Sequence, residues 1–324
     1  MEEPGIERVA KRKPPWLRRR LPRGPEFERV RAVLRKARLH TVCEEAMCPN
    51  LWECFSNHTA TFLILGDTCT RNCGFCAVKH GRPGSPDSTE TGRLVDTADQ
   101  LGLRHVVVTS VTRDDLPDGG AGQFADTVRE VHARLSGTAV ELLVPDFHGH
   151  REDLARVLDA GPEVLNHNLE TVERLYAVVR PGAEYNRSLT LLERAGGMAP
   201  DTPTKSGMML GLGERPDEVR RALQHLLDAG CRMLTLGQYL QPSRKHLEVR
   251  RYVPPEEFDE WRREALAMGF SGVESGPFVR SSYRAGELYR NLKAGVPAGA
   301  SIPGNKEERQ GPAAELNLDL SFGK

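Results

Sequence analysis

Six of the seven cysteines form two closely spaced groups of three, and thiols at such spacing can hold metals. Cys43, Cys48 and Cys54 have the spacing C-x4-C-x5-C. The second group, Cys69, Cys73 and Cys76, has the spacing C-x3-C-x2-C within the segment CTRNCGFC. The seventh, Cys231, stands alone, and a lone cysteine is most often a small buried hydrophobic residue. The chemistry to explain therefore lies in the two triplets.

Three ligands in each group favour iron–sulfur clusters over structural zinc. Structural zinc takes four ligands, usually from two short-spaced pairs, and only Cys73 and Cys76 form a C-x2-C pair. Thiolates spaced two to four residues apart are typical of ligands to four-iron clusters. Three thiolates leave one iron of such a cluster open to a substrate or cofactor. Zinc remains the alternative interpretation of these cysteines.

The rest of the chain alternates between short apolar runs and charged stretches of helical period, which predicts a parallel sheet with helical crossovers. The expected strands are 61–65, 105–110, 140–144, 164–166, 206–210, 233–236 and 272–274. The expected helices are 27–39, 91–101, 122–135, 151–159, 169–179, 215–229 and 255–268. We therefore expect an α/β fold, either doubly wound or a partial or complete barrel of about six strand–helix units.

Polar residues follow several of the expected strands, where parallel α/β folds place their ligand sites. The second cysteine triplet follows the first of these strands. We therefore expect the triplet to share one rim of the fold with the other polar residues at strand ends, which are Thr109, Asp146, Asn168, Glu170 and Gln238.

The net charge of zero conceals a strong asymmetry along the chain. Residues 1–40 carry 13 basic and 5 acidic side chains, and the remainder carries 32 and 40. The basic arm is a solvated segment, a nucleic-acid tail or a docking face for an acidic partner. No stretch has the roughly 18 apolar residues of a membrane span, and no apolar signal core is present. These features predict a cytoplasmic protein.

Several segments extend the pattern of the second triplet. CTRNCGFC, with an aromatic residue before its last cysteine, is similar to the signature of radical S-adenosylmethionine (SAM) enzymes. The segment 43–54, CEEAMCPNLWEC, resembles the N-terminal motif of the lipoyl synthase family. Further segments also resemble this family: 109–121, 144–147, 166–172, 179–183, 237–243 and 276–283. The resemblance covers residues 27–288 in order and leaves out the basic arm and the tail.

The resemblance implies a fold and a division of the chain. It implies a TIM-like (β/α)6 radical SAM barrel over residues 61–290, with a cysteine-containing extension at 27–60. Residues 1–26 and 291–324 would be a basic arm and a tail, both disordered.

The resemblance also implies a reaction and its cofactors. Lipoyl synthases are sulfurtransferases that insert sulfur at C6 and C8 of an octanoyl chain carried on a protein lysine. Two [4Fe-4S] clusters and SAM take part, and the cluster on Cys43, Cys48 and Cys54 would supply the sulfur. The C–H bonds at these carbons are unactivated, so a radical rather than a general base must attack them.

The implied partners follow from this reaction. They are octanoylated lipoyl carrier domains, meaning 2-oxoacid dehydrogenase E2 subunits and the glycine cleavage H protein. An electron donor such as ferredoxin or flavodoxin and iron–sulfur carrier proteins would also be needed. The resemblance implies a monomer without membrane or nucleic-acid partners.

The resemblance assigns roles to residues outside the cysteines. In the RSSY motif, Ser282 would be the fourth ligand of the sulfur-donating cluster, and Arg280 a further catalytic residue. Asn168, Glu170 and Arg180 would contact SAM. Simpler roles remain open: a helix cap for Ser282 and Asn168, a first-turn acid for Glu170, and a helix stop for Arg180.

Two rival functions stay open. One is another sulfur-inserting radical SAM enzyme such as biotin synthase, whose cluster pattern lacks the Cys43–Cys54 triplet. The other is a zinc-stabilised interaction or nucleic-acid-binding module that would use the basic arm and the cysteine loops.

Overall fold

A computed structural model describes residues 13–18, 25–56 and 60–295 of the chain. Its main sheet is an open barrel whose strands lie in the order β1-β2-β5-β6-β7-β8-β9-β10. All neighbours pair in parallel except β1 and β2, which are antiparallel. The strands are β1 (His40–Thr41), β2 (Thr61–Ile64), β5 (His105–Ser110), β6 (Ala139–Leu143), β7 (Val164–Asn166), β8 (Thr204–Leu210), β9 (Met233–Gln238) and β10 (Gly272–Gly276).

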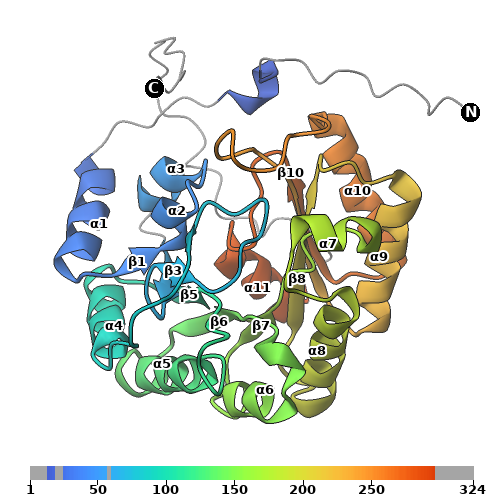
Figure 1. Cartoon of the computed structure of the whole chain (residues 1–324). Coiled ribbons are helices and arrows are strands. Elements are labelled where there is room, and N and C mark those ends of the chain that lie inside the picture. The colour runs from blue at the N-terminus through green and yellow to red at the C-terminus, as the bar shows by residue number, and fades with distance from the viewer. Residues whose placement is uncertain (1–12, 19–24, 57–59, 296–324) are drawn as a thin grey trace, which may run out of the picture.

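Helices surround this sheet, and Figure 1 shows them as an outer ring viewed down the barrel. They are α4 (Glu90–Gln100), α5 (Ala121–Arg134), α6 (Arg151–Leu158), α8 (Tyr185–Met198), α9 (Pro216–Asp228) and α10 (Pro255–Met268). The short α7 (Tyr176–Val179) lies inside this ring, near β8 (Figure 1). The last helix, α11 (Ala285–Lys293), lies in the middle of the ring (Figure 1). Its Leu288 and Tyr289 pack on Val164 and Met233, the first residues of β7 and β9, so α11 closes the amino-terminal end of the barrel.

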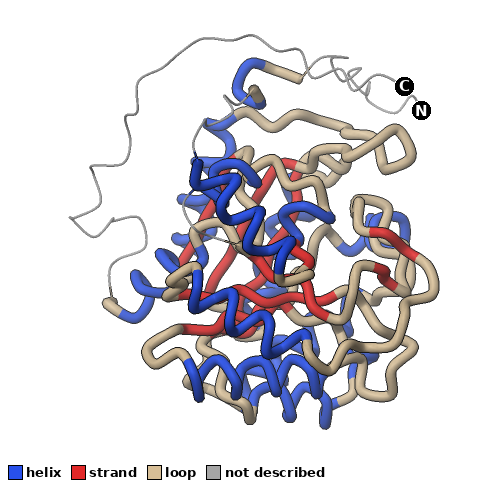
Figure 2. Tube along the Cα trace, turned by 90° about the vertical axis from the view of Figure 1, so that its left-hand side faces the viewer, coloured by secondary structure: helices blue, strands red, loops and turns tan. Residues whose placement is uncertain are grey.

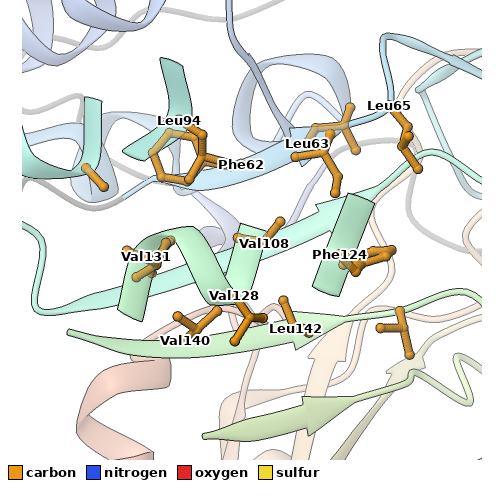
Figure 3. Packing of buried hydrophobic residues seen from close by; sticks show 14 of the residues in the cluster. Phe62, Leu63, Leu65, Leu94, Val108, Phe124, Val128, Val131, Val140 and Leu142 are labelled. Carbon is orange, nitrogen blue, oxygen red and sulfur yellow. The ribbon is translucent and has the colours of Figure 1, made fainter. Parts of the chain in front are cut away.

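The barrel is held by aliphatic contacts between strands and helices. Phe62, Val108 and Val140 face outward from their strands onto Leu94 of α4 and Val128 of α5 (Figure 3). All five side chains are almost completely buried. Burying such side chains contributes about 1.5–3 kcal/mol each relative to exposure, which makes this layer the main stabilising contact of the first half-barrel.

The N-terminal segment adds short elements that precede β2 in the chain. They are a 3-10 turn (Pro15–Leu17), α1 (Pro25–Lys36), α2 (Val42–Glu45) and α3 (Leu51–Ser56). Phe27 of α1 stacks on Trp52 of α3 with ring centroids 3.9 Å apart. Figure 2 shows the helices and strands of the barrel from the side. Helices α1, α2 and α3 therefore pack against the edge of the sheet that β1 and β2 form.

The predicted fold class is confirmed, with the barrel in its partial form, and all seven predicted strands are present. One helix prediction was wrong. Residues 169–179 do not form one helix, because Glu170 makes a parallel bridge to Met208 before a 3-10 turn (Glu173–Leu175) and α7. Helix α8 was not among the predicted helices, although its buried residues recur at helical spacing up to Ala195, before Gly196 and Gly197 in its last turn. Predictions for residues 1–12 and 296–324 lie outside the described residues.

Candidate active site

The second cysteine triplet lies on a loop at the carboxyl end of β2. The loop begins with β3 (Thr68–Cys69), which pairs with β4 (Lys79–His80). The Gly74 amide donates to the carbonyl of Val179 at the end of α7, at 3.0 Å. His246 Nε2 lies 3.0 Å from the carbonyl oxygen of Cys76. The loop is therefore fixed from both sides of the barrel mouth.

The three thiols of this loop have a polar and partly shielded environment. The Cys69 sulfur accepts two backbone N–H bonds, from Arg71 at 3.4 Å and Thr112 at 3.3 Å. Burial raises the pKa of Cys73 and raises the pKa of Cys76 to about 12. These thiols must release their protons when they bind a metal. Amide donors aimed at sulfur are the usual partners of a cluster-bound thiolate.

A second polar group faces the same mouth from the ends of β7 and α7. Asn168 Nδ2 donates to Glu170 Oε1 at 2.9 Å and to Ser281 Oγ at 2.5 Å. Arg180 Nη1 donates to the Asn168 carbonyl at 2.8 Å and to the Tyr176 hydroxyl at 2.7 Å. Three of the residues that the sequence proposed as cofactor contacts therefore form one hydrogen-bonded cluster.

The charged side chains of this hydrogen-bonded group act electrostatically on each other and on the cysteine loop. Burial raises the pKa of Glu170, although the charge of Arg180, the Asn168 bond and the charge of Arg280 act against this rise. The charge of Arg180 also acts on the Cys73 thiol and opposes the effect of burial on its pKa. Glu170 has a left-handed backbone with φ of 69°, which is uncommon for a residue other than glycine and is concentrated at functional sites. The cluster and the loop thus lie within electrostatic reach of each other.

Two atoms of the cluster are buried without a hydrogen-bond partner, which tests whether SAM would fit. They are Arg180 Nε, a donor, and Asn168 Oδ1, an acceptor. Unpaired buried polar atoms are rare, and each calls for a ligand or water. A carboxylate would satisfy the arginine, and an amino or hydroxyl group would satisfy the asparagine. SAM carries all of these groups, so the residues present fit it.

Gly207 of β8 lies beside Asn168 Oδ1 and Ser281 Oγ, and its lack of a side chain leaves room for both groups. A Cβ at this position would lie 2.9 Å from Asn168 Oδ1 and 3.2 Å from Ser281 Oγ. Any larger residue would push Asn168 and the 280–283 loop apart. The close approach of the loop to β7 therefore requires this glycine.

The first triplet lies on the N-terminal helices beside β2. Cys43 is in α2 and Cys54 in α3, with Cys48 between them. Burial, together with the charge of Cys48, raises the pKa of Cys43 to about 12, and the Thr61 backbone opposes this as a hydrogen-bond partner. The Thr61 hydroxyl donates to Ser282 Oγ at 2.8 Å. Thr61 therefore contacts both a cysteine of the first triplet and the serine of the RSSY motif.

Two further bonds hold the RSSY segment against the first triplet. Asn50 Nδ2 donates to the Phe278 carbonyl at 2.6 Å, and the Tyr283 hydroxyl donates to Glu53 Oε1 at 2.9 Å. Asn50 and Glu53 lie between Cys48 and Cys54 in the sequence. Ser282 does not act as a helix cap, since α11 begins after Arg284 without a side-chain cap. These contacts place the 278–283 segment beside the first triplet.

The described residues contain no group of three His, Cys, Asp or Glu side chains arranged around a single metal ion. His167 is buried between the Val144 carbonyl and the Ser188 hydroxyl, both within 2.9 Å. Burial lowers its pKa to about 4, so it is a neutral structural histidine.

Two other rim residues do not face the site. Gln238 Nε2 donates to three carbonyls and its Oε1 accepts from Val253, which satisfies the side chain within the protein. Thr109 Oγ1 donates to the Leu143 carbonyl at 2.8 Å. The polar atoms of these two side chains are thus already used by the backbone. Cys231 is fully buried, as the sequence predicted.

Sequence reasoning missed two residues that organise the site. Arg71, inside CTRNCGFC, forms ion pairs with Asp114 and Asp146, and Ser281 binds Asn168. The signal was present in part, because both aspartates follow expected strands at the rim. Their common partner could not be inferred, because it comes from a loop 43 residues from Asp114 and 75 from Asp146.

An open parallel barrel with a C-x3-C-x2-C loop after its first parallel strand defines a radical SAM enzyme. The family model described as "Radical SAM superfamily" matches residues 63–226. Among solved structures, HydG, a maturase of the iron–iron hydrogenase, shares the fold with a TM-score of 0.51. That match has 14% identity and covers 73% of this chain and 66% of HydG. At this identity it supports the fold alone.

The chain belongs to the lipoyl synthase family. The family model for the N-terminal domain of lipoyl synthase matches residues 5–48, so the likeness extends into the basic arm, contrary to the boundary expected at residue 27. Lipoyl synthase of Methylococcus capsulatus is 58% identical over 275 residues, covering 85% of each chain. That of Desulfotalea psychrophila is 54% identical over 281 residues, covering 87% of this chain and 94% of the relative. The protein is a radical SAM sulfurtransferase that inserts sulfur at C6 and C8 of protein-bound octanoyl-lysine.

Proposed function

We propose that this chain performs sulfur insertion with two [4Fe-4S] clusters held at the two cysteine triplets. Cys69, Cys73 and Cys76 would hold the cluster that binds SAM. Cys43, Cys48 and Cys54, with Ser282, would hold the cluster from which sulfur is drawn. The observation that supports this proposal is the contact of Thr61 with both Ser282 and Cys43, because it brings Ser282 from a distant segment close to the first triplet.

The cofactor would lie against Asn168, Glu170 and Arg180. When bound and reduced, SAM supplies a carbon radical that can take a hydrogen atom from an unactivated C–H bond. Arg180 would neutralise the methionine carboxylate through its free Nε–H, and Glu170 would accept from the ribose hydroxyls. The charge of Arg280 would add to that of Arg180 in opposing the rise that burial causes in the pKa of Glu170.

Ser282 would release the iron that it holds during sulfur transfer. A serine oxygen is a harder ligand than a thiolate, so it binds iron in a sulfide cluster less firmly. Ser281, the neighbouring residue, accepts a hydrogen bond at 2.5 Å from Asn168 Nδ2, and Asn168 is one of the proposed SAM contacts. The 280–283 segment therefore extends from one proposed cofactor site to the other.

The carrier protein would approach the open rim, where two exposed loops carry basic side chains. Arg82 follows the second triplet, while Arg244, Lys245 and Arg250 follow β9. None of these four forms an ion pair within the described part of the chain. Their charge contrasts with the acidic balance of the sequence after residue 40 and suits an acidic carrier surface.

The finer partner assignments rest on the resemblance. We propose octanoylated E2 domains and the glycine cleavage H protein as carriers, ferredoxin or flavodoxin as electron donor, iron–sulfur carrier proteins for repair, and a monomeric enzyme. The structure contains no helix in its described residues that is long and apolar enough to cross a membrane. A cytoplasmic site of action is proposed because thiols that serve as metal ligands persist in reducing compartments.

The test is anaerobic reconstitution followed by one incubation. The protein should bind about eight irons per chain with sulfide, four for each cluster. With SAM, a reductant and an octanoyl-lysine peptide, mass spectrometry should show two added sulfur atoms. Formation of 5′-deoxyadenosine without sulfur insertion would contradict the proposed sulfur donor and retain the radical chemistry.

A matched pair of variants separates the two sites. Cys43→Ala should lose about half of the iron and keep SAM cleavage, since it touches only the first triplet. Cys69→Ala should also lose about half of the iron but abolish cleavage. Equal effects of both variants on SAM cleavage would contradict the proposal that the two triplets hold clusters with different roles. Zinc without sulfide as the bound metal would favour the rival function, a zinc-stabilised interaction module.

A further inference from the structure

One arginine inside the radical cysteine loop bonds to two aspartates at once. The Arg71 side chain is 6% exposed and donates four hydrogen bonds. Nε and Nη2 bond to Asp114 at 2.8 and 2.9 Å, and Nη1 and Nη2 bond to Asp146 at 2.9 and 2.7 Å. Four of the five N–H groups of the guanidinium are therefore bonded to the two carboxylates. We name these three residues the Arg71 clamp.

The clamp ties the cysteine loop to two strands of the barrel. Asp114 follows β5 and Asp146 follows β6, while Arg71 lies between Cys69 and Cys73. Asp146 is completely buried, and an unpaired charge at such a place would be strongly destabilising. The strength of the clamp therefore depends on all three members remaining together.

The consequence of the clamp appears at the sulfur of Cys69. The Arg71 backbone N–H donates to this sulfur at 3.4 Å, and the Thr112 backbone N–H donates at 3.3 Å. Thr112 lies two residues before Asp114 and accepts at its carbonyl from the Thr70 amide and hydroxyl. One of the two amides aimed at the sulfur thus belongs to Arg71 itself. The other belongs to Thr112, which lies two residues before Asp114 in the chain.

We propose that Arg71 is a positioning residue for the radical cluster, which fixes the two N–H donors at the Cys69 sulfur and thereby sets the reduction potential of that cluster. This inference rests on the proposed role of Cys69, Cys73 and Cys76 as cluster ligands. Hydrogen bonds to the sulfurs tune the potential of iron–sulfur clusters. They stabilise the extra negative charge of the reduced state, so loosening them lowers the potential and makes reduction harder.

Lysine cannot replace the arginine in this geometry. An ammonium group is a compact charge that cannot pair bidentately with two carboxylates. Arg71→Lys keeps the positive charge between Asp114 and Asp146 but loses the planar fork. It therefore separates the positioning effect from the simple neutralisation of two buried acids.

The experiment is a redox titration of the reconstituted full-length protein, followed by electron paramagnetic resonance. The radical cluster is identified as the reduced signal that changes when SAM is added. In Arg71→Lys, the ratio of reduced to oxidised cluster at the wild-type midpoint should fall about tenfold, equivalent to about 59 mV for one electron. Asp114→Glu, which keeps the carboxylate charge but displaces it from the arginine fork, should shift the potential in the same direction and serves if the first variant loses its cluster.

The matched control is Arg156→Lys. Arg156 pairs with Asp118 at 3.3 Å on the same side of the barrel, is 55% exposed, and does not touch the cysteine loop. Its potential should equal that of the wild type. A wild-type potential in both Arg71→Lys and Asp114→Glu, at full iron content, overturns the inference.

The proposed function can fail separately. If Cys69→Ala retains all of its iron and its SAM-responsive signal, the ligand assignment is wrong and the clamp has no cluster to position. If Cys69→Ala loses that signal while the clamp variants keep their potential, only the inference about Arg71 is wrong. Iron content and the unfolding midpoint of each variant show whether a shift has a merely structural origin.

Discussion

The interior of the barrel contains a buried ion pair, and the effect of removing it on stability can be predicted and measured. Lys205 Nζ of β8 lies 2.8 Å from Glu141 Oε1 of β6, and both side chains are 0% exposed. Asn166 Nδ2 donates to the same oxygen at 3.2 Å, and His105 lies 3.5 Å from the other oxygen. Lys205 precedes Gly207 by two positions on β8, so both face the barrel interior. The pair therefore lies one layer below the proposed SAM contacts.

The magnitude follows from the electrostatics of the carboxylate. Burial alone would raise the pKa of Glu141, but the charge of Lys205 and the contact with His105 outweigh it and hold the pKa at about 2. Against its ordinary value of 4.5, this corresponds to about 3 kcal/mol of stabilisation at neutral pH. Breaking one partner of a buried pair commonly costs 3–5 kcal/mol, in agreement with this value.

Lys205→Met should therefore destabilise the protein by about 3 kcal/mol and lower the melting temperature by about 6–12 °C. The double variant Lys205→Met, Glu141→Leu should recover much of this loss, because apolar replacement of both partners removes the unpaired charge. Anaerobic thermal unfolding of proteins with equal iron content is the assay. Lys79→Met, which removes an exposed lysine 3.7 Å from Asp67, is the control and should change stability by less than about 0.5 kcal/mol.

The pH dependence has a defined sign. A carboxyl with a lowered pKa contributes its stability above the unfolded value of 4.5, and this contribution is lost as the pH falls toward 2. The difference between wild type and Lys205→Met should narrow over that range. A variant as stable as wild type at pH 7 would refute the reasoning that Glu141 is an ionised interior carboxylate stabilised by Lys205.

Three further predictions test the site. Arg180→Gln should weaken SAM binding to the reconstituted protein by roughly 30-fold or more, because a buried charged partner costs at least about 2 kcal/mol to remove, and an unchanged Kd by equilibrium dialysis would contradict the contact. Ser282→Cys should keep its iron but lose sulfur insertion into the octanoyl peptide, and full product yield would contradict ligand release. Cys231→Ala should lower stability by about 1 kcal/mol through a small cavity and leave iron content and activity unchanged, so a loss of iron would show that this thiol is not structural.

Sequence reasoning determined the chemistry of the site because that chemistry depends on local spacing. Cys69, Cys73 and Cys76 lie within one loop, and their spacing is set by the chain itself. The alternation of strands and helices determined the side of the sheet on which the loop emerges, because parallel strands end at one rim. The same reasoning could not separate Gln238 from Asn168, since both follow strands and only their backbone neighbours differ.

The tertiary structure decided which distant segments meet. Ser282 reaches Thr61 across 221 residues, and Arg71 reaches Asp146 across 75. Such contacts depend on how the barrel closes and where the final loop returns, and no local periodicity encodes either. The left-handed backbone at Glu170 likewise converts an expected helix into a bridge that turns its carboxylate inward. The sequence alone thus predicts the cysteine ligands, Ser282 and the rim. Only the tertiary structure brings Ser282 to Thr61 and forms the Arg71 clamp, because these contacts arise only when residues remote in sequence are packed together.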